Sequence, residues 1–281
     1  MGQDRRPLAV AVALLAAVAA GFGAGYLAWG IPTNWYAKDI AKVPPGEEGD
    51  LIRYGHALIV DTSKHIGKDA SDPALRYAGN NLACVNCHLN AGLQPFAAPF
   101  VSTFASFPML VNDQVLTLRE RINGCMQRSM NGKPLPAESR ELQALVAYIK
   151  FLGEGTPVGV RLPGMGLLPP SDPPQAPDAA RGEKVYAAKC AICHKADGQG
   201  ERRASPASGY VVPPLWGDDS FNSAAGMAKL AYAAAYIHAN MPLGVTYQDP
   251  VLSEQDAWDV AAYMISKPRP EAPPDVAAAV H

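Results

Sequence analysis

The feature that most constrains this chain is a five-residue pattern, Cys-x-x-Cys-His, that occurs twice. Two thiols at this spacing can form thioether bonds to the two vinyl groups of one porphyrin, and the adjacent imidazole can bind the iron. Zinc also uses Cys-x-x-Cys, but it does not call for a histidine directly after the second cysteine both times. We therefore predict two covalently bound haem c groups, attached through Cys84, Cys87, Cys190 and Cys193, with His88 and His194 as proximal iron ligands.

The amino-terminal segment is typical of an exported protein. Arg5 and Arg6 precede an apolar run over residues 8–31 that contains no charged residue. This run is long enough to span a bilayer as an uncleaved anchor, whereas the small residues at 17–19 would suit a signal peptidase. The resemblance of the motifs to those of c-type cytochromes implies haem attachment outside the cytoplasm. Both alternatives place the rest of the chain in the periplasm, and the first tethers it to the inner membrane.

Prolines divide the rest of the chain into domains. Residues 153–177 contain seven prolines and show no helical or strand periodicity, which is typical of an extended linker. We predict a leader or anchor at 1–31, a first domain at 32–152, a linker at 153–178, a second domain at 179–268 and a loose tail at 269–281. The formal net charge of −2 gives no indication of nucleic-acid binding.

Similar helices are predicted on both sides of each haem motif. Apolar residues at helical spacing surround Gly55 and Gly182, and further amphipathic helices are expected over 141–152 and 253–267. This pattern resembles the small helical cytochrome c fold, in which the first and last helices cross at a close glycine contact and clamp the haem. We therefore expect an all-α protein with two tandem class I cytochrome c-like domains.

The repeat also indicates a distal ligand for the second haem. In the fold that the chain resembles, a residue before the last helix reaches the open face of the iron, and it is often a methionine. Met241 lies 22 residues before Tyr263 and is followed by Pro242, which stiffens such a loop. Because a soft thioether suits haem iron, we expect Met241 to be this ligand, with His238 and plain core packing of Met241 as the alternatives.

The first domain leaves its distal ligand open. Counting the same 22 residues back from Tyr148 reaches Met126, and one residue further reaches Cys125, the cysteine that neither motif uses. Cys125 could be a small buried apolar residue, or a thiolate ligand that lowers the haem potential and supplies a nucleophilic sulfur. Met126 or Met130 as ligand would instead make this haem an ordinary high-potential carrier.

The stretch over residues 121–132, Arg-Ile-Asn-Gly-Cys-Met-Gln-Arg-Ser-Met-Asn-Gly, resembles a signature of the two-haem thiosulfate dehydrogenases, which form tetrathionate. The order of leader, long first domain, linker and shorter second domain is also similar. The resemblance implies that Cys125 is the distal ligand of the haem at which substrate reacts, and that Met241 serves the electron-exit haem. Some members carry a competing lysine just before this methionine; this chain has Asn240, so the resemblance does not extend to a ligand switch.

Joining two thiosulfate dianions requires positive charge to offset their repulsion and a sink for two electrons. Arg119, Arg121 and Arg128 flank Cys125, and Ser129 offers a hydroxyl. We expect Arg121, Arg128 and Ser129 to form an oxyanion pocket; solvated surface charges and a local backbone hydrogen bond are the ordinary alternatives. The working hypothesis is a sulfur–sulfur adduct between one thiosulfate and Cys125 as it leaves the iron, from which a second thiosulfate releases tetrathionate.

The second domain is the expected docking face for an electron acceptor. A soluble periplasmic cytochrome c, a high-potential iron–sulfur protein and a membrane oxidase all remain open, and the reaction can in principle run in reverse. The competing functions are a non-catalytic two-haem electron carrier, a cytochrome subunit of a membrane respiratory complex, and a haem subunit of a sulfur-oxidising multienzyme system. Cys125 favours the enzyme, because an electron carrier does not explain this residue.

Overall fold

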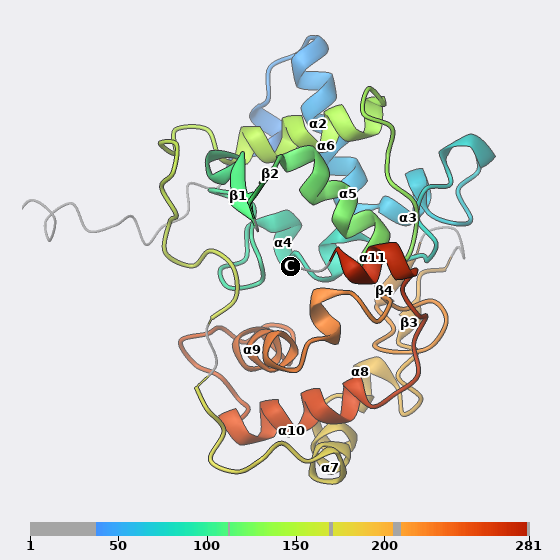
Figure 1. Cartoon of the computed structure of the whole chain (residues 1–281), viewed down its shortest axis with the longest axis vertical. Coiled ribbons are helices and arrows are strands. Elements are labelled where there is room, and N and C mark those ends of the chain that lie inside the picture. Colours follow the sequence, from blue (N-terminus) through green and yellow to red (C-terminus); the bar gives the residue numbers. More distant parts are fainter. Residues whose placement is uncertain (1–37, 112, 169–170, 205–208, 280–281) are drawn as a thin grey trace, which may run out of the picture. The chain divides into compact units, whose positions relative to one another are not determined.

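The computed structural model describes residues 38–111, 113–168, 171–204 and 209–279. The predicted leader or anchor at 1–31 lies outside these ranges. Within them, none of the helices combines the length and apolar character needed to cross a bilayer. The principal helices are α2 (Glu47–Val60), α3 (Thr62–Ile66), α4 (Leu89–Gly92), α5 (Leu118–Arg128), α6 (Arg140–Leu152), α7 (Ala179–Lys189), α8 (Ala191–His194), α9 (Leu230–Asn240), α10 (Glu254–Ile265) and α11 (Pro274–Ala278) (Figure 1).

The first domain is built on the crossing of α2 and α6, which pack against each other along the top of Figure 1. The helices touch at Gly55, where a Cβ atom would lie 2.0 Å from the carbonyl oxygen of Ala144 and 2.7 Å from the Cβ of Tyr148. Only a residue without a side chain allows this approach. The predicted glycine contact is confirmed.

The second domain repeats this construction with α7 and α10. A Cβ atom on Gly182 would lie 1.9 Å from the carbonyl oxygen of Asp259. Ser253 caps the last helix, because its hydroxyl accepts a hydrogen bond from the Asp256 N–H at 3.1 Å. The same helix pair therefore frames both haem motifs.

Two expectations were wrong in part. The fold is mostly helical rather than all-α, because it includes two antiparallel hairpins, β1 (Met109–Val111) with β2 (Gln114–Leu116) and β3 (Glu201–Arg202) with β4 (Tyr210–Val212). The described part of the tail is not loose: it forms α11, which buries Val276 and contacts α5. The sequence does not reveal this packing because the prolines of the tail interrupt helical periodicity. Their carbonyl oxygens can nevertheless accept hydrogen bonds. The described part of the 153–178 linker contains no helix or strand.

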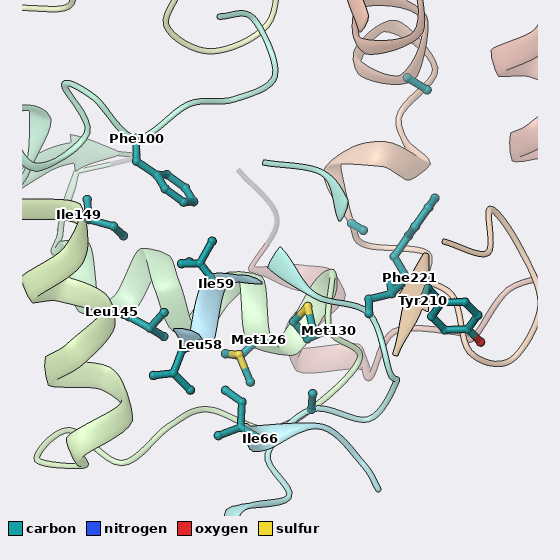
Figure 2. Packing of buried hydrophobic residues seen from close by; sticks show 14 of the residues in the cluster. Leu58, Ile59, Ile66, Phe100, Met126, Met130, Leu145, Ile149, Tyr210 and Phe221 are labelled. Carbon is teal, nitrogen blue, oxygen red and sulfur yellow. The ribbon is translucent and has the colours of Figure 1, made fainter. Parts of the chain in front are cut away.

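A hydrophobic core lies between α2, α5 and α6 in the first domain. Met126, Leu58 and Ile66 belong to one cluster of buried hydrophobic residues, part of which Figure 2 draws together with Tyr210 and Phe221 of the second domain. Met126 is 2% exposed and Met130 is 4% exposed. Both methionines therefore serve as core residues of the first domain.

The two domains meet at Asp219, whose side chain is 10% exposed. Its carboxylate is 2.7 Å from Lys68 of the first domain and 2.7 Å from Arg202 of the second. The Tyr210 hydroxyl donates a hydrogen bond to it at 2.6 Å, and the Asn81 N–H donates one at 3.3 Å. Because four donors satisfy one carboxylate, this contact fixes the neighbouring loop of the second domain against the first.

Candidate haem and substrate sites

The first motif is held by hydrogen bonds that leave its histidine ready for a metal. The Nδ1 atom of His88 is 2.6 Å from the carbonyl oxygen of Ala98, so the opposite ring nitrogen is free to bind iron. Burial lowers the pKa of His88 to about 4, and the charge of Arg121 contributes in the same direction. The imidazole is therefore neutral at pH 7, as a ligand must be.

The second motif has the same arrangement. The Nδ1 atom of His194 is 3.0 Å from the carbonyl oxygen of Pro213, and burial lowers the pKa of His194. A cavity of about 720 Å³ opens beside it; Cys190, Cys193 and Met241 line it on this side, and residues of the first motif, including Cys87, line it as well. Its volume is in the range of cofactor sites, about 300–1,000 Å³. The thiols, the imidazole, the thioether and the apolar wall fit a haem c.

His238, the alternative to Met241, lies at a different place. It lines a separate cavity of about 170 Å³ together with Ser171 and Trp258. The structure thus brings Met241 into the cavity that contains His194 and leaves His238 out of its lining. Iron binding by Met241 stays a prediction.

Cys125 and Met126 are neighbours on α5, but they face different surroundings, because successive side chains on a helix diverge by roughly 100°. Met126 points into the core (Figure 2), whereas Cys125 is partly exposed. The pKa of Cys87 is raised to about 12, chiefly by burial and in addition by the charges of Cys84 and Cys125. This interaction places Cys125 beside the first haem motif. The structure thereby separates the two residues that the spacing left open.

The arginines near Cys125 have unequal roles. Burial lowers the pKa of Arg128. The charge of Cys125 acts in the opposite direction, and the charge of Arg121 lowers this pKa further. The three side chains are therefore close enough to interact electrostatically. Among the residues that the structure describes, neither Arg121 nor Arg128 forms an ion pair with a carboxylate. Arg119 is engaged elsewhere, with the carbonyl of Ala137 at 2.5 Å and with Glu138 at 3.8 Å. Two unpaired cations beside Cys125 can therefore receive an anion.

Ser129 follows the last residue of α5 and has a backbone role. Its N–H donates a hydrogen bond to the carbonyl of Cys125 at 2.9 Å, and its own carbonyl accepts one from the Asn80 side chain at 3.0 Å. These bonds link Ser129 to the position of Cys125. A substrate contact by the Ser129 hydroxyl stays a prediction.

Two residues that are distant from the first motif in the sequence form hydrogen bonds to it, and the sequence analysis did not identify them. Thr62, fully buried, accepts a hydrogen bond from the Cys84 N–H at 3.0 Å. The hydroxyl of Tyr236, in the second domain, donates to the carbonyl of Cys87 at 3.0 Å, and Tyr236 also lines the second cavity. Both contacts join residues far apart in the chain, and backbone carbonyls carry no signal in a sequence. Neither residue could be found from spacing.

Two segments of the chain, one around each haem motif, match known protein families. Residues 76–158 match the family described as SoxA/TsdA, cytochrome c domain, and residues 179–267 match the family described as cytochrome c. Each match contains one haem motif. The second also contains both framing helices, α7 and α10, whereas the first contains α6 but begins after α2. The described fold therefore contains two cytochrome c domains.

Individual relatives match over most of the chain. A thiosulfate dehydrogenase of Stutzerimonas stutzeri (strain A1501) is 42% identical over 256 residues, which is 90% of this chain and 77% of the relative. One from Thiomonas intermedia (strain K12) is 42% identical over 83% of this chain and 70% of its own length. A solved structure of thiosulfate dehydrogenase (TsdBA) from Marichromatium purpuratum superposes with a TM-score of 0.78 at 33% identity. The match covers 89% of this chain but only 54% of the solved chain, so this chain spans about half of its length.

Proposed function

Because the chain belongs to the thiosulfate dehydrogenase family, at 37–42% identity to its curated relatives, we propose that it joins two thiosulfate ions into tetrathionate beside Cys125. The chain is a thiosulfate-oxidising cytochrome with two covalently bound haem c groups. The observation that supports the proposal is the position of Cys125, which lies near enough to the first haem motif to affect the pKa of Cys87 and is next to two arginines without carboxylate partners. An electron carrier has no use for such an anion site.

In the proposed reaction, the two electrons released by the substrate are equal in number to those that the two haems can accept. Two thiosulfate dianions give one tetrathionate dianion and two electrons, and the haems, when bound, supply one-electron acceptors for both. The Cys125 sulfur forms a bond to the outer sulfur of the first thiosulfate as these two electrons are lost. The outer sulfur of the second thiosulfate then attacks that sulfur of the adduct and displaces the Cys125 thiolate. Arg121 and Arg128 offset the repulsion between the two anions.

We assign electron exit to the second domain, with His194 and Met241 as iron ligands. Their shared cavity supports this assignment, because a thioether ligand favours a higher potential than a thiolate does. The acceptor in the proposal is a periplasmic cytochrome c or a high-potential iron–sulfur protein. Export through the apolar segment at 8–31 places the enzyme in the periplasm, and an uncleaved segment would hold it at the inner membrane.

The proposal is tested by mixing the oxidised holoprotein with thiosulfate under anaerobic conditions. We expect the haem absorption bands to show reduction, and we expect one tetrathionate for every two thiosulfate ions consumed when an artificial acceptor such as ferricyanide is present. Reduction of the haems by thiosulfate without free tetrathionate would reject the assigned product. Absence of reduction by thiosulfate would favour the electron-carrier function.

Replacing Arg128 by glutamine should weaken use of thiosulfate. The substitution removes a partly buried positive charge beside Cys125, and losing a charge-assisted contact of this kind costs about 2–3 kcal/mol. We expect kcat/KM for thiosulfate to fall about 30- to 150-fold, with most of the loss recovered in Arg128→Lys. Steady-state kinetics with an artificial acceptor measure this change.

Arg119→Gln is the matched control for this experiment. Arg119 lies on the same helix, but its guanidinium is bonded to the Ala137 carbonyl and to Glu138. We expect its kcat/KM to stay within about threefold of the unmodified protein, as is usual for a surface charge. Equal losses in the two variants would show that general charge, rather than a local anion site, acts on thiosulfate.

A further inference from the structure

The helix that carries Cys125 ends on donors from both domains: the Ser129 and Gly132 N–H groups of the first domain donate to the carbonyls of Cys125 and Met126, and the second domain supplies the donors for the next two carbonyls. The last carbonyl groups of an α-helix have no partner within the helix and need donors from elsewhere. The side-chain amide of Asn222 donates to the carbonyl of Gln127 at 2.8 Å, and the Asn222 N–H donates to the carbonyl of Arg128 at 3.2 Å. Both accepting residues belong to the last turn of α5, within three residues of Cys125. The second domain therefore satisfies the last two carbonyl groups of this helix.

Every donor and acceptor of the Asn222 side-chain amide is used in hydrogen bonds to other residues of this chain. The residue is fully buried, its second donor bond goes to Asn131 at 3.2 Å, and its side-chain oxygen accepts the N–H of Ala224 at 3.1 Å. All of its bonds are thus within the protein. Two of the residues bonded to its side chain, Gln127 and Asn131, lie in the first domain and bracket the Arg128–Met130 segment that follows Cys125.

The loop that carries Asn222 is itself fixed on both sides. The side chain of Asn80, from the segment before the first haem motif, donates to the carbonyls of Ser129 and Ser220 at 3.0 and 3.1 Å. On the other side, the Ser223 N–H donates to Pro270 of the tail at 2.9 Å, and the Ser223 hydroxyl donates to Glu271 at 2.9 Å. The tail then ends in α11, which contacts α5 (Figure 1). The residues on either side of Asn222 are therefore hydrogen-bonded to the first domain and to the tail.

We propose that Asn222 is a positioning residue for Cys125: it holds the last turn of α5 from the second domain and so keeps the Cys125 sulfur at the first haem. The catalytic role of that sulfur rests on the proposed function, whereas the hydrogen bonds that position α5 do not depend on it. Displacement of a reacting group by about 1 Å can cost about 100-fold in rate. The electron-exit domain thereby contributes directly to the geometry of the catalytic site in the other domain.

The test uses Asn222→Asp in the full-length holoprotein. Aspartate keeps the size of asparagine and the main-chain bond to Arg128, but it cannot donate to Gln127 or Asn131. We expect alkylation of Cys125 by iodoacetamide, followed by mass spectrometry in the oxidised protein, to accelerate at least tenfold. We also expect weaker spectroscopic signs of a thiolate-bound ferric haem and a kcat lowered about 10- to 100-fold. The other four cysteines are bound in thioethers, so the probe reports Cys125 alone.

Gln199→Ala is the control, because it removes a hydrogen bond to the Trp216 carbonyl in the second domain without touching α5. Its Cys125 alkylation rate should equal that of the unmodified protein. Unchanged alkylation in both Asn222→Asp and Asn222→Ala would overturn the proposal. Faster alkylation in these variants, together with full activity of a Cys125→Ser protein, would instead keep the positioning role and reject the catalytic role of the sulfur.

Discussion

Replacing Cys125 by serine is expected to lower thiosulfate turnover at least about 1,000-fold, which is the scale on which enzymes lose activity with their nucleophile. A hydroxyl is a poorer ligand for haem iron than a soft thiolate is. It also cannot form the sulfur–sulfur bond that the proposed chemistry requires. Cys125 is partly exposed and lies near Cys84 and Cys87, which is the position that the proposed contacts with substrate and haem require. Anaerobic mixing with thiosulfate, with tetrathionate assayed in parallel, measures the effect; Cys125→Gly should behave alike.

Met126→Leu provides the matched control at the adjacent position. Its side chain is buried in the same cluster as Leu58 and Ile66, and a change of methionine to leucine conserves volume and usually costs less than about 1.5 kcal/mol (Figure 2). We expect near-normal reduction by thiosulfate in this variant. Activity retained in Cys125→Ser and lost in Met126→Leu would show that the methionine is the distal ligand and that the catalytic role given to Cys125 is wrong.

Replacing Gly55 by alanine should be among the most destabilising single changes in the first domain. Alanine in a helix is ordinarily better than glycine by about 0.5–1 kcal/mol. Here its Cβ would lie 2.0 Å from the carbonyl oxygen of Ala144, so α2 and α6 would have to move apart. We expect the free energy of unfolding of the holoprotein to fall by more than about 4 kcal/mol, measured by chemical denaturation and circular dichroism.

Gly226→Ala tests whether this loss comes from the helix contact rather than from the substitution itself. A Cβ on Gly226 would meet only a Tyr232 side-chain carbon at 3.7 Å, an ordinary contact distance. Its effect should stay within about 1 kcal/mol. Similar stability of the Gly55 and Gly226 variants would mean that α2 and α6 can separate without cost, contrary to the close packing of the core.

The sequence alone predicted the parts of the fold that depend on short spacings. The Cys-x-x-Cys-His motifs identify the cofactor because both thioether bonds and the proximal ligand come from five consecutive residues. Helical periodicity predicted the helices themselves. Their pairing, α2 with α6 and α7 with α10, and the glycines at the crossings were implied by the resemblance to the cytochrome c fold and are present in the structure. The two hairpins were missed, since strands of two or three residues are too short to show a period.

What only the tertiary structure decided are the contacts between residues distant in the chain. Spacing could not separate Cys125 from Met126; the direction in which each leaves α5 does so, because one lies near the haem motif and the other is buried in the core. Likewise, the sequence places Arg119 near Cys125, and only the structure shows that its guanidinium is bonded to the Ala137 carbonyl and lies near Glu138. The hydrogen bonds from Asn222 to α5 join two domains through backbone carbonyl groups, which are the same in every residue. A local pattern therefore determines which chemistry the chain can carry, whereas packing determines which side chains can reach it.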